Sequence, residues 1–150
     1  MRNTNYPLTV YYDASCPLCM AEMSNLMLRN REAKLVFVDV SATPGISPLP
    51  GVPYADLMRL LHARAADGRV IRGVPALHAA YTAVALGWVT RPTTWPLIGP
   101  LADALYPFVA RHRQRIPRVV VRWLFEGASR RAAEHAAARG SCSQGQCTPR

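Results

Sequence analysis

Near its start the chain reads Leu8-Thr9-Val10-Tyr11-Tyr12-Asp13-Ala14-Ser15-Cys16-Pro17-Leu18-Cys19, and this stretch decides the fold. Residues 8–12 are β-branched and aromatic, a composition typical of strands, and the run stops at the three residues that follow. From Pro17 onward apolar residues recur with the spacing of an amphipathic helix, at Cys19, Met23, Leu26 and Met27. The stretch therefore predicts a strand that leads directly into a helix, with Cys16 at the helix N-terminus.

The residues around Cys16 favour a helix start. Pro17 suits the first helical position, where its missing N–H is not needed, and Ser15 can supply a capping hydroxyl. A thiol at such a helix end meets unsatisfied N–H groups and the positive end of the helix dipole. Both favour the thiolate, which is the form that attacks a disulfide.

The rest of the first half predicts a parallel β-α-β unit followed by a hairpin. Residues 34–40 form a nearly continuous apolar run, which predicts a strand covered on both faces. The Pro- and Gly-rich residues 41–53 predict a loop, with a short helical turn at 54–56. Two strands, over 57–65 and 69–72, flank the turn dipeptide Asp67-Gly68.

Helices are expected after the hairpin. Pro75 can open one that Gly87 ends, and two more are expected at about 97–113 and 118–138, before a polar segment at 140–150. The predicted fold class is α/β, a thioredoxin-like core (β-α-β, then β-hairpin and α) with extra C-terminal helices. We expect three parts: a core domain at 1–116, a basic C-terminal helix at 117–139, and a flexible tail at 140–150 that carries Cys142 and Cys147.

The candidate catalytic residues are Cys16, Cys19 and Asp13. We expect Cys16, at an exposed helix end, to be the more acidic and more alkylation-prone thiol and to attack a disulfide. Cys19, one helical turn inward, would then resolve the mixed disulfide. Asp13 has two open roles, since it could accept or relay a proton or could cap the turn through backbone hydrogen bonds. The alternative for the cysteines is a pair of packed, inert thiols.

These motifs, together with the 67–73 hairpin and residues 106–113, resemble the DCC family of predicted thiol-disulfide oxidoreductases, over about residues 8–116. The family is named for an Asp, a Cys and a Cys, which would here be Asp13, Cys16 and Cys19. The resemblance implies a thioredoxin-like fold and protein-disulfide reductase activity. Ala14 stands where the family usually has Gly. Thioredoxins also carry a proline directly before the strand that faces the cysteines, and Pro53 is the nearest candidate here.

No cofactor or metal is expected, although two roles for the tail cysteines stay open. Cys142 and Cys147 could pass electrons to the Cys16–Cys19 disulfide, or all four cysteines could bind zinc. The spacing of Cys142 and Cys147 is wider than in the usual zinc knuckle. The third alternative is an unstructured tail with reduced thiols.

The net charge of +9 is concentrated at the C-terminal end, because residues 111–150 hold nine Arg and two Glu (9 − 2 = +7), which leaves +2 for residues 1–110. Such a face allows contact with nucleic acid or an anionic membrane, although a solvated surface is the first expectation and nucleic acid is not an expected partner. No window approaches the roughly 18 consecutive apolar residues of a membrane span. With no export signal expected either, the chain is predicted to be cytoplasmic.

The expected function is thiol-disulfide exchange on a disulfide-containing protein or a small thiol substrate, with an external dithiol as electron donor. A non-catalytic thioredoxin-like binding module is the alternative, with or without a bound metal. A third class is a basic interaction protein that uses the C-terminal arginines, Arg111, Arg113, Arg115, Arg118 and Arg122, and whose binding would fall as salt rises.

Overall fold

A four-stranded mixed sheet forms the centre of the molecule. In the computed structural model, residues 5–96, 98–112, 117, 119–121, 123, 125, 127, 130, 133–134, 142–143 and 146–147 are described. The strand order is β2-β1-β3-β4, with β1 at Leu8–Tyr12, β2 at Leu35–Asp39, β3 at His62–Arg64 and β4 at Val70–Arg72. β1 pairs in parallel with β2 and antiparallel with β3, and β3 pairs antiparallel with β4. The predicted β-α-β unit and hairpin are therefore confirmed, and β1 is a central strand.

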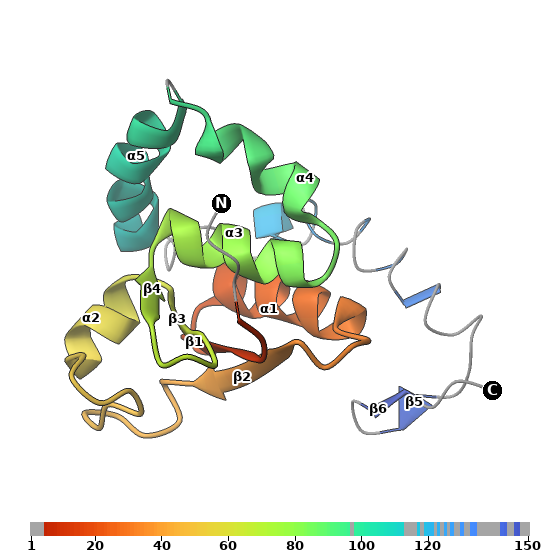
Figure 1. Cartoon of the computed structure of the whole chain (residues 1–150), viewed down its shortest axis with the longest axis horizontal. Coiled ribbons are helices and arrows are strands. Elements are labelled where there is room, and N and C mark those ends of the chain that lie inside the picture. The colour runs from red at the N-terminus through yellow and green to blue at the C-terminus, as the bar shows by residue number, and fades with distance from the viewer. Residues whose placement is uncertain are drawn as a thin grey trace.

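Helices cover one face of this sheet. The helices α1 (Pro17–Arg29) and α3 (Val74–Ala83) lie side by side on it (Figure 1). They pack Met23, Leu26 and Ala80 against Leu8 and Val10 of β1 in the main apolar cluster. Alternate side chains of β1 point to the other face, where Tyr11 packs in a smaller cluster with the 41–53 loop and with α2 (Tyr54–Arg59). This is a mixed α/β architecture consistent with a thioredoxin-like fold.

The remaining described helices follow α3 along the chain. They are α4 (Gly87–Thr90), the short 3₁₀ segment η1 (Arg91–Thr94) and α5 (Ile98–His112), which confirms the helix expected at about 97–113. The described residues between 119 and 134 are helical, as expected for the 118–138 segment, and the others there lie outside the described residues. In Figure 1, α5 stands beside α3 at the end of the molecule that also carries α2.

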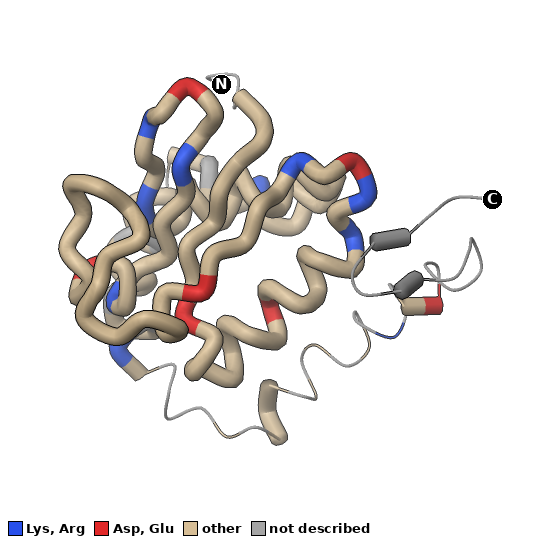
Figure 2. Tube along the Cα trace, turned by 90° about the horizontal axis from the view of Figure 1, so that it is seen from below, with Lys and Arg blue, Asp and Glu red and all other residues tan. Residues whose placement is uncertain are grey.

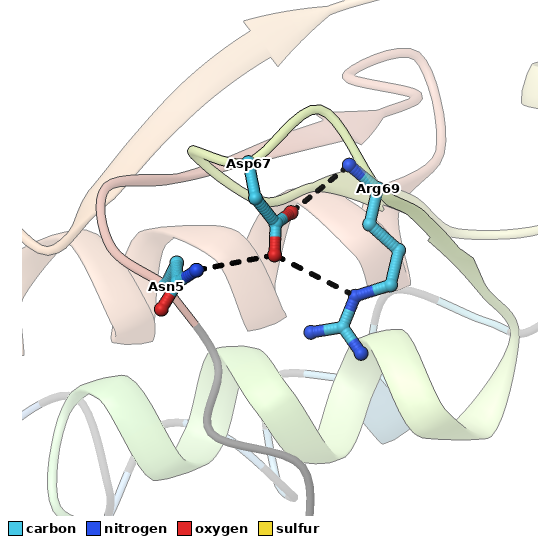
Figure 3. Close-up of polar contacts among 3 residues, drawn as sticks. All are labelled: Asn5, Asp67 and Arg69. Atoms are coloured by element: carbon cyan, nitrogen blue, oxygen red, sulfur yellow. Dashed lines mark hydrogen bonds and ion pairs between the residues drawn. The ribbon is translucent and has the colours of Figure 1, made fainter.

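The hairpin turn is tied to the segment that precedes β1. One carboxylate oxygen of Asp67 accepts the Arg69 N–H at 3.0 Å, and the other accepts the Asn5 side-chain amide at 3.2 Å and lies 4.0 Å from Arg69 Nε (Figure 3). The Asn5 carbonyl accepts the Ala66 N–H at 3.1 Å. Gly68 has a φ of +84°, the left-handed conformation that glycine adopts without strain. The turn therefore has the residues that its backbone requires.

Several finer predictions are wrong. Residues 57–59 belong to α2, so the first hairpin strand is shorter than expected, and Gly87 begins α4, because α3 already ends at Ala83. The strand β2 is an edge strand with Val36 46% exposed, so it is not covered on both faces. Met27 is 37% exposed, because at about 100° per residue it lies well away from the direction of Leu26 on α1.

Candidate active site

Cys16 is the N-cap residue of α1 and follows the central strand by one short turn. Its backbone is extended (φ −86°, ψ 117°), Pro17 begins the helix, and the Cys16 carbonyl accepts the Met20 N–H at 2.9 Å. The helix start is therefore where the sequence predicted it. The expected capping by Ser15 is wrong, since the Ser15 hydroxyl donates to Asp13 instead. The N-cap position places Cys16 at the positive end of the helix dipole.

The exposure of the two thiols is the reverse of the expectation. Cys16 is fully buried at 0% exposure, whereas Cys19 in the first turn of α1 is partly exposed. The prediction that Cys16 lies at an exposed helix end is therefore wrong. The N-cap side chain is therefore buried, whereas Cys19 in the first helical turn is partly accessible to solvent.

Asp13 is 1% exposed and holds the turn that carries Cys16. Its Oδ1 accepts the Ser15 N–H at 3.0 Å and the Ser15 hydroxyl at 2.5 Å, and its carbonyl accepts the Cys16 N–H at 3.3 Å. This is an Asx turn, in which a carboxylate replaces a backbone acceptor two residues away. The bonds support the capping role of Asp13, and its proton-transfer role stays a prediction.

Asp39 makes a second turn of the same kind at the end of β2, next to the first. Its Oδ1 accepts the Ser41 N–H at 2.9 Å, the Ser41 hydroxyl at 2.6 Å and the Ala14 N–H at 3.2 Å. Burial alone raises the pKa of Asp39, but these hydrogen bonds and one from the Ala42 N–H together lower it below its usual value. Sequence analysis missed this residue. The repeated Asp-x-Ser pattern at the end of each parallel strand, at 13–15 and 39–41, is the signal that would have found it.

The opposite side of this strand end is formed by Leu60, Leu61 and Gly73. The β1–β3 register pairs Tyr11 with His62, so Leu61 comes opposite Tyr12 at the end of β1 from which the chain runs to Cys16. The Leu61 N–H donates to the Tyr106 hydroxyl of α5 at 3.3 Å, and the Leu61 carbonyl accepts the Gly73 N–H at 2.8 Å. Pro53 is the N-cap residue of α2, so it does not precede a strand.

A hydrogen bond between side chains connects α1 to α3, one helical turn after Cys19. The Tyr81 hydroxyl donates to Glu22 Oε1 at 3.2 Å. Burial, followed by the charge of Glu22, raises the pKa of Tyr81 well above its usual value, so this phenol stays a neutral donor. Glu22 lies three residues after Cys19 and therefore on the same side of α1.

Within the described part of the chain, no three His, Cys, Asp or Glu side chains come together in a way that could hold a metal ion. The tail was expected to be flexible, and four of its residues are described as strand. They form the strands β5 (Cys142–Ser143) and β6 (Gln146–Cys147), with Cys142 and Cys147 paired opposite each other. The tail side chains lie outside the described residues, and so do four of the five arginines of the expected basic face, Arg113, Arg115, Arg118 and Arg122.

Arg111 of that basic face is described and is exposed. In the described domain, basic and acidic residues are interspersed along the chain trace and do not form a field of one sign (Figure 2).

None of the helices in the described residues is both long enough and apolar enough to span a bilayer.

A helix that begins directly after the central strand of a mixed α/β sheet, with Cys16 at its N-cap and Cys19 in its first turn, is consistent with a thioredoxin-like fold. The chain matches the model of the DCC1-like thiol-disulfide oxidoreductase family over residues 10–119 and belongs to that family. It is also 39% identical over 115 residues to an uncharacterized protein of Arabidopsis thaliana that is named as chloroplastic, which covers 75% of this chain and 53% of that relative. The chain thus spans about half the length of this relative. No solved structure matches the present chain.

Proposed function

We propose that this protein is a thiol-disulfide oxidoreductase whose redox centre is the Cys16–Cys19 pair. The observation that carries the proposal is the position of Cys16 as the N-cap of α1, with Cys19 in the first turn, at the end of the central strand. The helix dipole acts within this first turn, where it stabilises negative charge. The family supplies the redox role, and the Cys-x-x-Cys chemistry is our proposal.

In the proposed reaction Cys19 reacts first, because it is the thiol that solvent reaches. Its thiolate attacks one sulfur of the substrate disulfide, and the other sulfur leaves as a thiolate that takes up a proton. The Cys16 thiolate then attacks Cys19 of the mixed disulfide and releases the second substrate sulfur as a thiol. Two electrons pass to the substrate and a Cys16–Cys19 disulfide forms, which an external dithiol reduces again.

Asp13 completes the proposed centre. The carboxylate holds the turn that sets the position of Cys16, and it is also the candidate acceptor for a thiol proton. The couple needs no cofactor. It requires a reducing compartment, which we propose to be the cytoplasm, and the named Arabidopsis relative is described as chloroplastic.

Equilibration of the full-length chain in a series of glutathione redox buffers tests the proposal. A variant with Cys142→Ser and Cys147→Ser restricts the measurement to the Cys16–Cys19 pair. We expect one two-electron transition, with loss of two hydrogens by mass and a Cys16–Cys19 link in the peptide map. If the two thiols stay reduced across the whole series, the non-catalytic binding module takes the place of the enzyme.

The order of attack is tested with single variants on the same background. If Cys19 reacts first, Cys16→Ser accumulates a mixed disulfide on Cys19, whereas Cys19→Ser loses disulfide reduction. A mixed disulfide that accumulates on Cys16 in the Cys19→Ser variant would reverse the order that we propose.

A further inference from the structure

We propose that the substrate of this centre is a low-molecular-weight disulfide and not a polypeptide that pairs with the protein as an added strand. The inference rests on the proposed function. It comes from the backbone hydrogen bonds of the three chain segments that meet at the end of β1, which are residues 13–16, residues 60–61 and Gly73.

An extended polypeptide docks at a sheet by pairing with backbone N–H and C=O groups that the protein leaves unbonded. On the Leu60–Leu61 segment all four such groups have partners within the chain. The Leu60 N–H donates to Asp56 at 3.0 Å, and the Leu60 carbonyl accepts His62 Nδ1–H at 2.9 Å. The Leu61 N–H and carbonyl are bonded to Tyr106 and Gly73.

The Tyr106 hydroxyl substitutes for a strand carbonyl in this arrangement. Gly73 pairs with Leu61 through its N–H, but its own carbonyl accepts the N–H groups of Ala76 and Leu77 at the start of α3. β4 therefore leaves the Leu61 N–H without a strand partner, and α5 supplies one through a side chain. The Tyr106 hydroxyl therefore accepts the hydrogen bond of the Leu61 N–H, which the carbonyl of an incoming peptide would otherwise accept.

In the segment that carries Cys16, the backbone N–H groups also have partners within the chain. The Ala14 N–H donates to Asp39, the Ser15 N–H to Asp13 Oδ1, and the Cys16 N–H to the Asp13 carbonyl. Cys16 is also fully buried and Cys19 only partly exposed. A narrow disulfide that needs no backbone pairing suits such a site better than a strand of a larger protein.

The test compares two disulfides, bis(2-hydroxyethyl) disulfide and insulin, with dithiothreitol as the electron donor and the Cys142→Ser, Cys147→Ser chain as the enzyme. The readout is the acceleration of each reduction over dithiothreitol alone. We expect the acceleration to be about tenfold or more greater for the small disulfide, which is roughly what two backbone hydrogen bonds contribute to binding. Equal or greater acceleration for insulin would overturn the inference.

Tyr106→Phe supplies the internal test, because it removes the acceptor from the Leu61 N–H and leaves the ring in place. We expect the ratio of insulin to small-disulfide reduction to rise severalfold, and to stay unchanged in the control Tyr81→Phe, whose hydroxyl bonds Glu22. An unchanged ratio in Tyr106→Phe would contradict the role of this hydroxyl. Reduction of neither disulfide would instead overturn the proposed function, and this inference with it.

Discussion

The bond between Asp13 and Ser15 gives a quantitative test of how the turn before Cys16 is held. Hydrogen bonds to a charged group contribute about 1.5–3 kcal/mol each, and the lower end applies here because Ser15 is an exposed residue. Asp13→Ala removes the acceptor of two bonds, from the Ser15 N–H and hydroxyl, so we expect the free energy of unfolding to fall by about 3 kcal/mol. Ser15→Ala removes the hydroxyl bond alone and should lower it by about 1.5 kcal/mol.

The two changes should not add. Once Asp13 is alanine, the Ser15 hydroxyl has lost this acceptor, so the double variant should be only as unstable as Asp13→Ala, a coupling of about 1.5 kcal/mol. Urea unfolding of the four full-length proteins at neutral pH, with excess dithiol, measures all four free energies. If the two losses add, the hydroxyl contributes nothing through Asp13 and our account of the turn is wrong.

Asp13→Asn separates the two roles that the sequence left open. Asparagine keeps an acceptor oxygen for Ser15, so we expect most of the stability to remain, within about 1 kcal/mol of the parent. A general base typically contributes about 100-fold or more to a rate. A loss of that size in disulfide reduction at retained stability assigns proton transfer to Asp13, and a loss of a few fold assigns the residue to the turn alone.

Three further outcomes follow from the same region. Iodoacetamide at neutral pH should label Cys19 before Cys16 in the folded protein, since Cys16 is buried and Cys19 is partly exposed, and peptide mapping of the product decides the order. Because the pKa of Asp39 is lowered in the folded protein, the ionised carboxylate stabilises the fold above its unfolded pKa, and this contribution is lost as the pH falls below about 5. The variant Asp39→Asn should therefore unfold more easily than the parent at neutral pH, and the difference in free energy of unfolding between the two should shrink when it is measured at acid pH. Gly73→Ala should destabilise by about 1–3 kcal/mol in urea unfolding, because φ +69° and ψ −141° strain any side chain although the Tyr106 ring leaves room for a Cβ.

Local signals in the sequence predicted the core of this fold because they agree with one another. The strand 8–12, the helix start at Pro17 and the Asp67-Gly68 turn were all found, since each rests on a residue type that its backbone position requires. The limits of the first hairpin strand were not, because Leu57 and Leu61 are buried on different elements and apolar residues alone do not separate a short helix from a strand. The exposure of the two thiols also required the structure, since burial depends on packing against distant parts of the chain.

The position of the site explains why its backbone is so fully bonded. β1 is central, so its carboxyl end lies beside the end of β2, where the chain leaves the sheet, and the start of β3, where the chain enters it. At such strand ends some backbone N–H groups have no partner in the sheet. Side chains accept several of these hydrogen bonds, from Asp13 and Asp39 on one side and from Tyr106 on the other. In the proposed mechanism, this end then presents the partly exposed Cys19 and side-chain surface to a substrate. We expect the proposed centre to select among disulfide substrates by their reactivity toward the thiol and by their shape. The comparison of Tyr106→Phe with Tyr81→Phe measures how much of that selection a single hydroxyl provides.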